Sequence, residues 1–108
     1  MSYKVMFTDS AVRDLEELDA YIARNDSPAA AEYVLGRIEE KLVSLSEFPE
    51  RGVYPQELSA LGIREYREIF FKPYRIIYRV VKNTVYIYLI VDGRRDMQSL
   101  LDRRLLND

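Results

Sequence analysis

Residues 72–97 read KPYRIIYRVVKNTVYIYLIVDGRRDM, and this stretch decides the fold. Side chains alternate from Tyr74 to Val81, which predicts a strand with two distinct faces. Lys82-Asn83 favours a two-residue hairpin turn. Residues 84–91 are apolar nearly throughout, which is typical of a strand that is covered on both faces. The stretch therefore predicts an antiparallel strand pair with one tight turn.

Further elements flank this pair on both sides. Residues 63–71 predict a preceding strand, which Lys72-Pro73 connects to the pair through a turn. Before it, residues 56–61 favour one helical turn. After the pair, Gly93 ends the last strand and Asp96 can cap a final helix. The apolar side chains of that helix are Met97, Leu100, Leu101 and Leu105.

The first half of the chain predicts one strand and two helices. Residues 3–8 alternate between polar and apolar side chains, as a strand with one buried face does. Asp9 or Ser10 then offers an N-cap oxygen for a first helix. Ser27 can cap a second helix over residues 28–46, since the proline at position 28 suits the first helical position.

The predicted order of elements is β-α-α-β-β-β-α, which indicates an α+β fold. We expect an antiparallel sheet with the N-terminal helical hairpin on one face and a short C-terminal helix. A chain of 108 residues, 48% of them apolar, matches one globular domain over residues 1–108.

Composition excludes several kinds of chemistry. The chain has no histidine and no cysteine, so disulfide frameworks, histidine or thiolate metal sites and serine–histidine–aspartate triads are ruled out. Its four glycines form no phosphate-binding loop. We therefore expect no cofactor and no metal, and any acid or base must be an Arg, Lys, Tyr, Asp, Glu or hydroxyl side chain.

The net charge of -2 conceals an asymmetry. Residues 1–50 carry eleven acidic and five basic side chains, whereas residues 51–108 carry eleven basic and seven acidic ones. This indicates either an anionic partner for the basic half or acidic helices that pack beside a basic sheet. The longest apolar run, residues 85–91, is far below the ~20 residues of a membrane span. With no signal-peptide pattern, we expect a cytoplasmic protein without a membrane partner.

Cations are concentrated on the predicted strands. Arg75 and Arg79 share one face of their strand, while Arg94 and Arg95 follow the last strand. Guanidinium groups suit phosphates and carboxylates, and interleaved tyrosines can stack on bases. Tyrosine is also a common strand residue with no such role. The basic strand residues are Arg64, Arg67, Lys72, Arg75 and Arg79, and the tyrosines are Tyr54, Tyr66, Tyr74, Tyr78, Tyr86 and Tyr88.

Two segments of the second half resemble a known family. The run YRIIYR at residues 74–79, followed by the corner GRRD at 93–96, resembles the RelE/ParE toxin superfamily of type II toxin–antitoxin systems. The likeness covers nearly the whole chain. It implies one of two activities: RelE-like members cut mRNA on the ribosome, whereas ParE-like members poison DNA gyrase without cutting RNA.

The resemblance allows the RelE site to be transferred position by position. Arg75 matches the strand arginine, and Arg95 matches the arginine after the last strand. The position of the catalytic tyrosine falls on Leu101, which has no proton to transfer. RelE-like members carry a pair of lysines on the preceding strand. The corresponding positions here are residues 66–68, of which only Arg67 is basic. The C-terminal stretch 95–105 resembles the ParE ending instead.

The resemblance therefore implies a ParE-like toxin that arrests growth by poisoning DNA gyrase and is neutralised by a cognate antitoxin. We expect the chain to form a hetero-oligomer with the antitoxin, which lays an extended or helical segment across the sheet and the helical hairpin. A homodimer of the chain is a second assembly that the resemblance leaves open. No residue is assigned as catalytic. The expected target-binding residues are Arg67, Arg75, Arg94 and Arg95, acting through charge.

Two alternatives stay open on the sequence. In one, the chain is a RelE-like ribosome-dependent mRNA interferase in which Arg75 and Arg95 hold the phosphate, with an unidentified acid or base; ribosome and mRNA are then the partners. In the other, it is a non-toxic binding or plasmid-maintenance module of the same fold.

Overall fold

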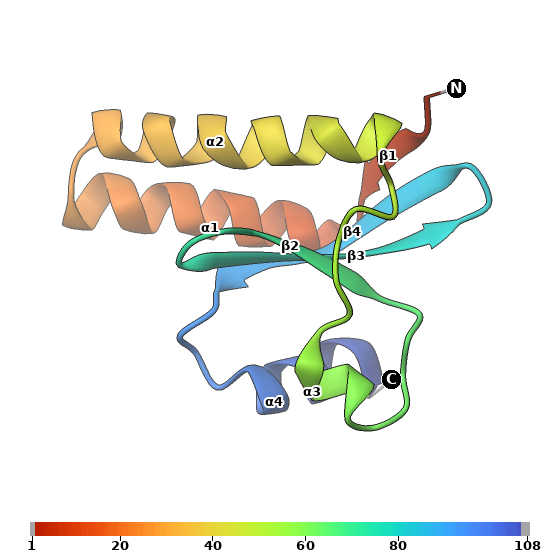
Figure 1. Cartoon of the computed structure of the whole chain (residues 1–108). Helices are drawn as coiled ribbons and strands as arrows, with labels where there is room; N and C mark the ends of the chain where they lie inside the picture. Colours follow the sequence, from red (N-terminus) through yellow and green to blue (C-terminus); the bar gives the residue numbers. More distant parts are fainter. Residues whose placement is uncertain (1, 107–108) are drawn as a thin grey trace.

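The computed structural model describes residues 2–106 and confirms the predicted order of elements. Figure 1 shows them arranged around one sheet. Along the chain they are β1 (Lys4–Phe7), α1 (Asp9–Asn25), α2 (Pro28–Glu47), α3 (Gln56–Ser59), β2 (Arg67–Phe71), β3 (Tyr74–Val81), β4 (Thr84–Asp92), α4 (Met97–Leu101) and η1 (Asp102–Leu106), the last a single π-helical turn.

The sheet is mixed, which corrects the expected antiparallel sheet. Its strands lie in the order β1-β4-β3-β2, and β1 pairs with β4 in parallel while the other neighbours are antiparallel. No hairpin joins β1 to β4; the chain passes through the helices first, so nothing forces these two strands into opposite directions. The predicted turn at Lys82-Asn83 is confirmed, since Val81 pairs with Thr84 across it and Lys82 has a φ of 56°.

The long helices begin at side-chain caps. Thr8 Oγ1 accepts a hydrogen bond from the Ala11 N–H, so Thr8, rather than Asp9 or Ser10, caps α1. The predicted cap of α2 is confirmed, because Ser27 Oγ accepts from the Ala30 N–H. Asp96 likewise caps α4, as predicted. None of the helices over residues 2–106 combines the length and apolarity that a bilayer span requires.

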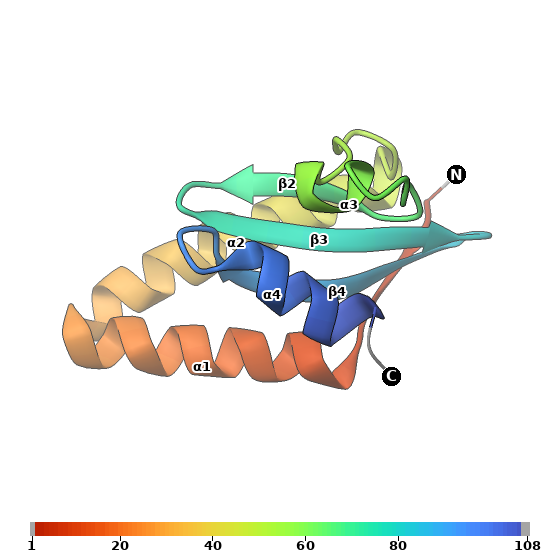
Figure 2. The same ribbon diagram turned by 90° about the horizontal axis from the view of Figure 1, so that it is seen from below.

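Two apolar clusters cover opposite faces of the sheet. The hairpin-side core joins α1 and α2 to one face and includes Ile38, Leu45, Ile76 and Ile87. The α4-side core joins α3 and α4 to the other face (Figures 1 and 2). Its members are Leu58, Tyr66, Ile77, Leu89, Val91, Met97, Leu100 and Leu101. Strands β3 and β4 contribute to both clusters, as the apolar run of residues 84–91 predicts.

Strand β2 begins later than predicted. Residues 63–66 lie outside it, because the Ile63 N–H donates to the Leu58 carbonyl of α3 and Tyr66 is buried in the α4-side core. The ladder starts where Arg67 stands opposite Tyr78. The segment before β2 is therefore a loop packed on the sheet, and it carries Arg64 and Tyr66 close to the end of β3.

Candidate functional site

The structure separates one of the four predicted arginines from the other three. Arg75 stands opposite Val91, at the end where β4 runs into Arg94 and Arg95. Arg67 stands opposite Tyr78, several residues further along β3. Three of the predicted residues therefore lie near one end, and Arg67 lies towards the other.

Arg75 is held between two carboxylates. Its Nη1 and Nη2 donate to both oxygens of Glu57 at 2.8 Å, and its Nε donates to Glu68 Oε1 at 2.7 Å. The Arg75 side chain is only 13% exposed. Hydrogen bonding to Glu57 raises the pKa of Arg75 and lowers the pKa of Glu57. Burial raises the pKa of Glu68 despite the bond to Arg75. The charge of Arg75 is thus neutralised within the protein.

Gly93 lies directly after β4, in the turn that leads to Arg94, and its backbone packs against Arg75. A Cβ atom at position 93 would lie 2.6 Å from Cδ of Arg75, and the Gly93 N–H donates to the Pro73 carbonyl at 2.8 Å. Only glycine avoids this clash without moving the arginine. Arg75 therefore supports the corner that presents Arg94 and Arg95.

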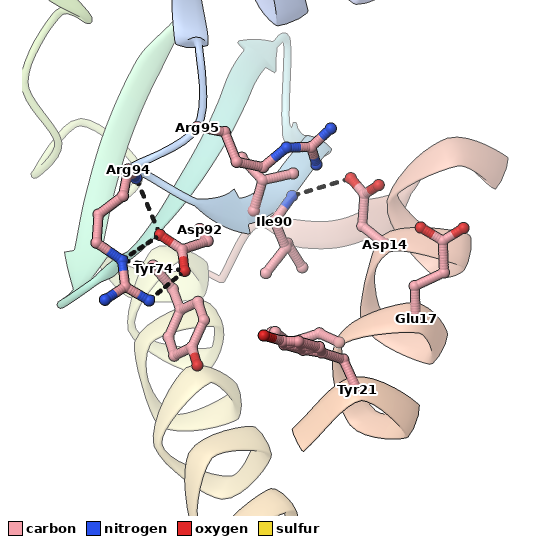
Figure 3. A pocket seen from close by; sticks show the side chains of 10 residues that line it. Asp14, Glu17, Tyr21, Tyr74, Ile90, Asp92, Arg94 and Arg95 are labelled. Atoms are coloured by element: carbon pink, nitrogen blue, oxygen red, sulfur yellow. Dashed lines mark hydrogen bonds and ion pairs between the residues drawn. The ribbon is translucent and has the colours of Figure 1, made fainter. Parts of the chain in front are cut away.

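Arg94 and Arg95 border a groove between α1 and the ends of β3 and β4, which we call the Arg94 groove (Figure 3). Its volume is about 390 Å³. The side chains of Tyr21 of α1 and Tyr74 of β3 both face into this groove (Figure 3). The groove is lined by Asp14, Glu17, Leu18, Tyr21, Tyr74, Ile90, Val91, Asp92, Arg94 and Arg95.

The two groove arginines differ in their partners. Arg94 forms a forked ion pair with Asp92, with Nη2 to Oδ2 at 2.6 Å and Nε to Oδ1 at 3.0 Å. This contact lowers the pKa of Asp92. Arg95 is exposed, and within residues 2–106 its guanidinium has no hydrogen bond or ion pair. Arg95 is therefore the cation of the groove that is free to meet an external anion.

Asp14 closes the sheet edge beside the groove, a role that the sequence did not indicate. Strand β1 ends at Phe7, opposite Ile87, so the next part of β4 has β3 on one side and no strand on the other. Asp14 Oδ2 accepts from the Ile90 N–H at 3.1 Å and pairs with Arg104, which also donates to the Tyr88 carbonyl. Asp14, Glu17 and Tyr21 lie on one face of α1, and this helical spacing was their only sequence signal.

The groove has groups for recognition. Burial, with the nearby Asp92 charge, raises the pKa of Tyr74, so this phenol stays neutral at physiological pH and can donate a hydrogen bond. Leu101, at the position of the expected catalytic tyrosine, is fully buried in the α4-side core. The described residues contain no cluster of carboxylates that could hold a metal ion. The arrangement can bind a partner through one free guanidinium, two phenols and carboxylates.

Arg67 belongs to a second group of side chains. Its guanidinium lies 4.6 Å from the centre of the Tyr54 ring, and Arg64 lies over the same ring at 5.9 Å. Arg79 lies 5.9 Å from the centre of the Tyr66 ring. We call these five residues the arginine–tyrosine cluster. The sequence marked Arg64 and Arg79 as strand cations but did not show that they meet Arg67, because this depends on the loop before β2.

A family model and a relative with a known name both match this chain to ParE toxins. A family model described as "ParE toxin of type II toxin-antitoxin system, parDE" matches residues 5–97. Toxin ParE3 of Caulobacter vibrioides is 29% identical over 101 residues, which is 94% of this chain and 97% of that protein.

Solved structures share the fold. A chain of a chromosomal ParDE system from P. aeruginosa superposes with a TM-score of 0.70 at 19% identity, over 84% of this chain and 96% of that one. A chain of the RelBE2 toxin–antitoxin complex from Mycobacterium tuberculosis gives 0.59 at 25% identity, over 85% and 99%. A variant of E. coli RelE in the free state gives 0.63 at 18% identity, over 97% and 100%.

Proposed function

The chain belongs to the family of ParE toxins of type II toxin–antitoxin systems, and on this premise we propose that it arrests growth by poisoning DNA gyrase. The target is contacted by Arg94 and Arg95 at the Arg94 groove. Arg75 acts indirectly, by supporting the Gly93 corner. A cognate antitoxin neutralises the toxin by binding to it.

The burial of Leu101 is the observation that carries this proposal. A ribonuclease of the related branch needs a proton donor at this position, and a leucine that is 0% exposed offers none. Removing a positioned acid or base typically costs about 10²–10⁴-fold in rate. The neutralisation of Arg75 by Glu57 and Glu68 points the same way, because a phosphate would have to compete with two carboxylates for this guanidinium. Both features support action by binding.

The proposed antitoxin contact has support from the surface of the helical hairpin. Val12, Tyr21, Tyr33 and Val43 are large side chains on α1 and α2 that are 42–64% exposed. Exposed apolar side chains on these two helices are available for contact with a partner chain. The M. tuberculosis structure is that of a toxin–antitoxin complex, which supports a hetero-oligomer of this kind here.

The test compares two targets in parallel. The purified chain is added to DNA gyrase with relaxed plasmid, and to a coupled translation system in which mRNA ends are mapped. We expect lost supercoiling or cleaved plasmid, with intact mRNA. Codon-phased mRNA cleavage with unaffected gyrase would overturn the proposal in favour of a ribosome-dependent nuclease. No effect in either system, and no growth arrest on expression, would leave a binding module of the same fold.

Two variants test the groove itself. Arg95→Gln and the double variant Arg94→Gln/Arg95→Gln are expected to weaken the effect on gyrase by roughly tenfold or more, since each removes a charged contact. Arg13→Gln is the matched control, because Arg13 is an exposed arginine of α1 outside the groove. Equal activity of all these variants would remove the groove from the target surface.

A further inference from the structure

The three arginines of the arginine–tyrosine cluster line a second hollow, away from the Arg94 groove along β3. This hollow measures about 240 Å³ and is lined by Glu50, Arg64, Glu65, Arg67, Arg79 and Val80. The three arginines come from three segments: the loop before β2, the start of β2 and the last part of β3. Since segments this different converge, the hollow is a product of the fold and not of one basic run.

Arg67 is oriented by neutral groups. Its Nη1 donates to the Gly52 carbonyl at 2.9 Å and to the Glu50 carbonyl at 3.4 Å, and its Nη2 donates to the Tyr54 hydroxyl at 3.2 Å. The ring of Tyr54 lies against the same guanidinium. Carbonyls, a hydroxyl and an aromatic face fix the direction of a guanidinium without cancelling its charge.

Arg79 and Arg64 are held in a similar way. Arg79 lies over Tyr66, which is itself fixed by an edge-to-face contact with Tyr88 at 5.4 Å between ring centres. Arg64 shares the ring of Tyr54 with Arg67. The tyrosines that interleave with the basic strand residues thus act as supports for the cations.

The cluster contrasts, in its lack of ion pairs, with Arg75, Arg94 and Arg104, which lie elsewhere on the sheet and at the C-terminal end. Arg75, Arg94 and Arg104 each pair with a carboxylate at 3.0 Å or less. Within the described part of the chain, none of the three cluster arginines has a carboxylate oxygen within 4.0 Å, although Glu50 and Glu65 line the same hollow. Three cations and two anions leave the hollow with a net positive charge that the protein does not neutralise by contact.

We propose that this hollow binds a phosphate group of the DNA backbone. Several guanidinium groups around one hollow can share the oxygens of a phosphate diester, to which their forked donors are matched. Such contacts position a protein on nucleic acid without reading its sequence. The choice of DNA over RNA rests on the proposed function, because gyrase holds DNA beside any protein bound to it.

The test measures binding of the purified chain to a short fluorescent DNA duplex by anisotropy, over a range of salt concentrations and without gyrase. Arg64→Gln/Arg79→Gln is expected to lower the affinity at least tenfold. The slope of log K against log salt is expected to fall by about 0.9 for each phosphate that the protein no longer neutralises. Arg64→Gln alone is expected to lower both the affinity and the salt slope. Because Arg64 is exposed, this variant provides the test if the double variant fails to fold.

The matched control is Arg13→Gln, which removes the same charge from the surface of α1. Unchanged affinity and slope in the cluster variants, or an equal loss in the control, would overturn the inference. Tighter binding of an RNA strand than of DNA through the same arginines would overturn the assignment to DNA.

The same variants separate this inference from the proposed function. If the wild-type chain poisons gyrase while its binding to DNA does not depend on the cluster, the phosphate site is wrong and the gyrase proposal stands. If gyrase is unaffected while DNA binding depends on the cluster arginines, the gyrase proposal is wrong and the phosphate site stands.

Discussion

At Gly52 the backbone lies against the hydroxyl end of the Tyr78 side chain. The Gly52 N–H donates to the Tyr78 hydroxyl at 3.0 Å, and a Cβ atom at this position would lie 2.6 Å from that oxygen and 2.7 Å from the Glu68 carbonyl oxygen. Tyr78 is fully buried and cannot move aside. We expect Gly52→Ala to destabilise the protein by about 1–3 kcal/mol through overpacking, measured by urea denaturation.

Gly36 supplies the matched control. It lies in the interior of α2, and a Cβ atom there would meet nothing within 4 Å. Close approach of another helix therefore does not explain this glycine. Gly36→Ala is expected to stabilise the protein by up to about 1 kcal/mol through helix propensity. Equal effects of the two substitutions would contradict the tight packing at Gly52.

The Glu57–Arg75 pair makes part of the stability depend on pH. Its bond to Arg75 holds the pKa of Glu57 below the ordinary value of 4.5, so the stabilisation is present above that pH and is lost as the pH falls through the folded-state pKa. We expect Glu57→Gln to cost about 1 kcal/mol at neutral pH, discounted for partial exposure. The difference from wild type should vanish in acid. Glu68 opposes this trend, because its raised pKa favours the folded state as the pH falls.

Denaturation at several pH values measures the difference. Glu39→Gln, at an exposed position of α2, controls for the loss of one negative charge. A penalty for Glu57→Gln that persists unchanged in acid would show that the ion pair is not its source.

At the scale of elements, the start of α1 allows a test of which side chain caps the helix. Three candidates, Thr8, Asp9 and Ser10, follow one another, and the structure uses Thr8. Thr8→Ala is expected to cost about 0.5–2 kcal/mol, since an N–H of the first turn loses its acceptor. Ser10→Ala should cost nothing or stabilise slightly, because alanine is the better helix former. The reverse order in thermal or chemical denaturation would place the cap at Ser10.

Arg104 attaches the C-terminal segment, α4 and η1, to α1 and the sheet. Its guanidinium bridges Asp14 of α1 and the Tyr88 carbonyl of β4, and the side chains of Arg104 and Asp14 are 20% and 10% exposed. Arg104→Ala leaves a largely buried carboxylate without its cation. We expect a loss on the order of 3 kcal/mol, and faster hydrogen exchange in α4 and η1. Arg103→Ala, at an exposed neighbour, should change stability by less than about 0.5 kcal/mol. Similar losses in both variants would contradict this attachment.

The elements differ in how well the sequence predicts them. The β3–β4 hairpin and the α2 cap depend on residues within a few positions of one another, such as Lys82-Asn83 and Ser27, and both were predicted. The direction of β1 depends on how the helical hairpin returns the chain to the sheet. No residue of Lys4–Phe7 carries that information, so the parallel pairing with β4 was missed.

At the scale of the whole molecule, the same distinction applies to the candidate site. Arg94 and Arg95 follow the last strand, but the sequence left open whether they face solvent or pair with Asp92 and Asp96; the structure pairs Arg94 with Asp92 and leaves Arg95 exposed. The neutralisation of Arg75 could not, because its partner Glu57 is 18 residues away and lies on α3. The convergence of Arg64 and Arg79 on Arg67 equally depends on where β2 begins. Charge counts therefore locate a basic half, whereas only the fold decides which cations are free.

The whole molecule should unfold as one unit, because both apolar clusters share their strands. Ile76 and Ile77 are neighbours in β3, yet they belong to the hairpin-side core and the α4-side core respectively. Loss of either cluster therefore exposes one face of the same central strands. This expectation also tests the prediction of a single domain over residues 1–108.

Leu45→Ala and Leu101→Ala form a matched pair for this test, since each removes a leucine that is 0% exposed, one from each cluster. Each is expected to cost about 2–5 kcal/mol. Both should shift one transition, with coincident curves from far-ultraviolet circular dichroism and from tyrosine fluorescence, the intrinsic probe of a chain without tryptophan. A first transition that reports only the tyrosines of the α4 side in Leu101→Ala would show that this cluster unfolds separately. In that case the sheet does not couple its two faces, and the corner that carries Arg94 and Arg95 could open without unfolding the helical hairpin.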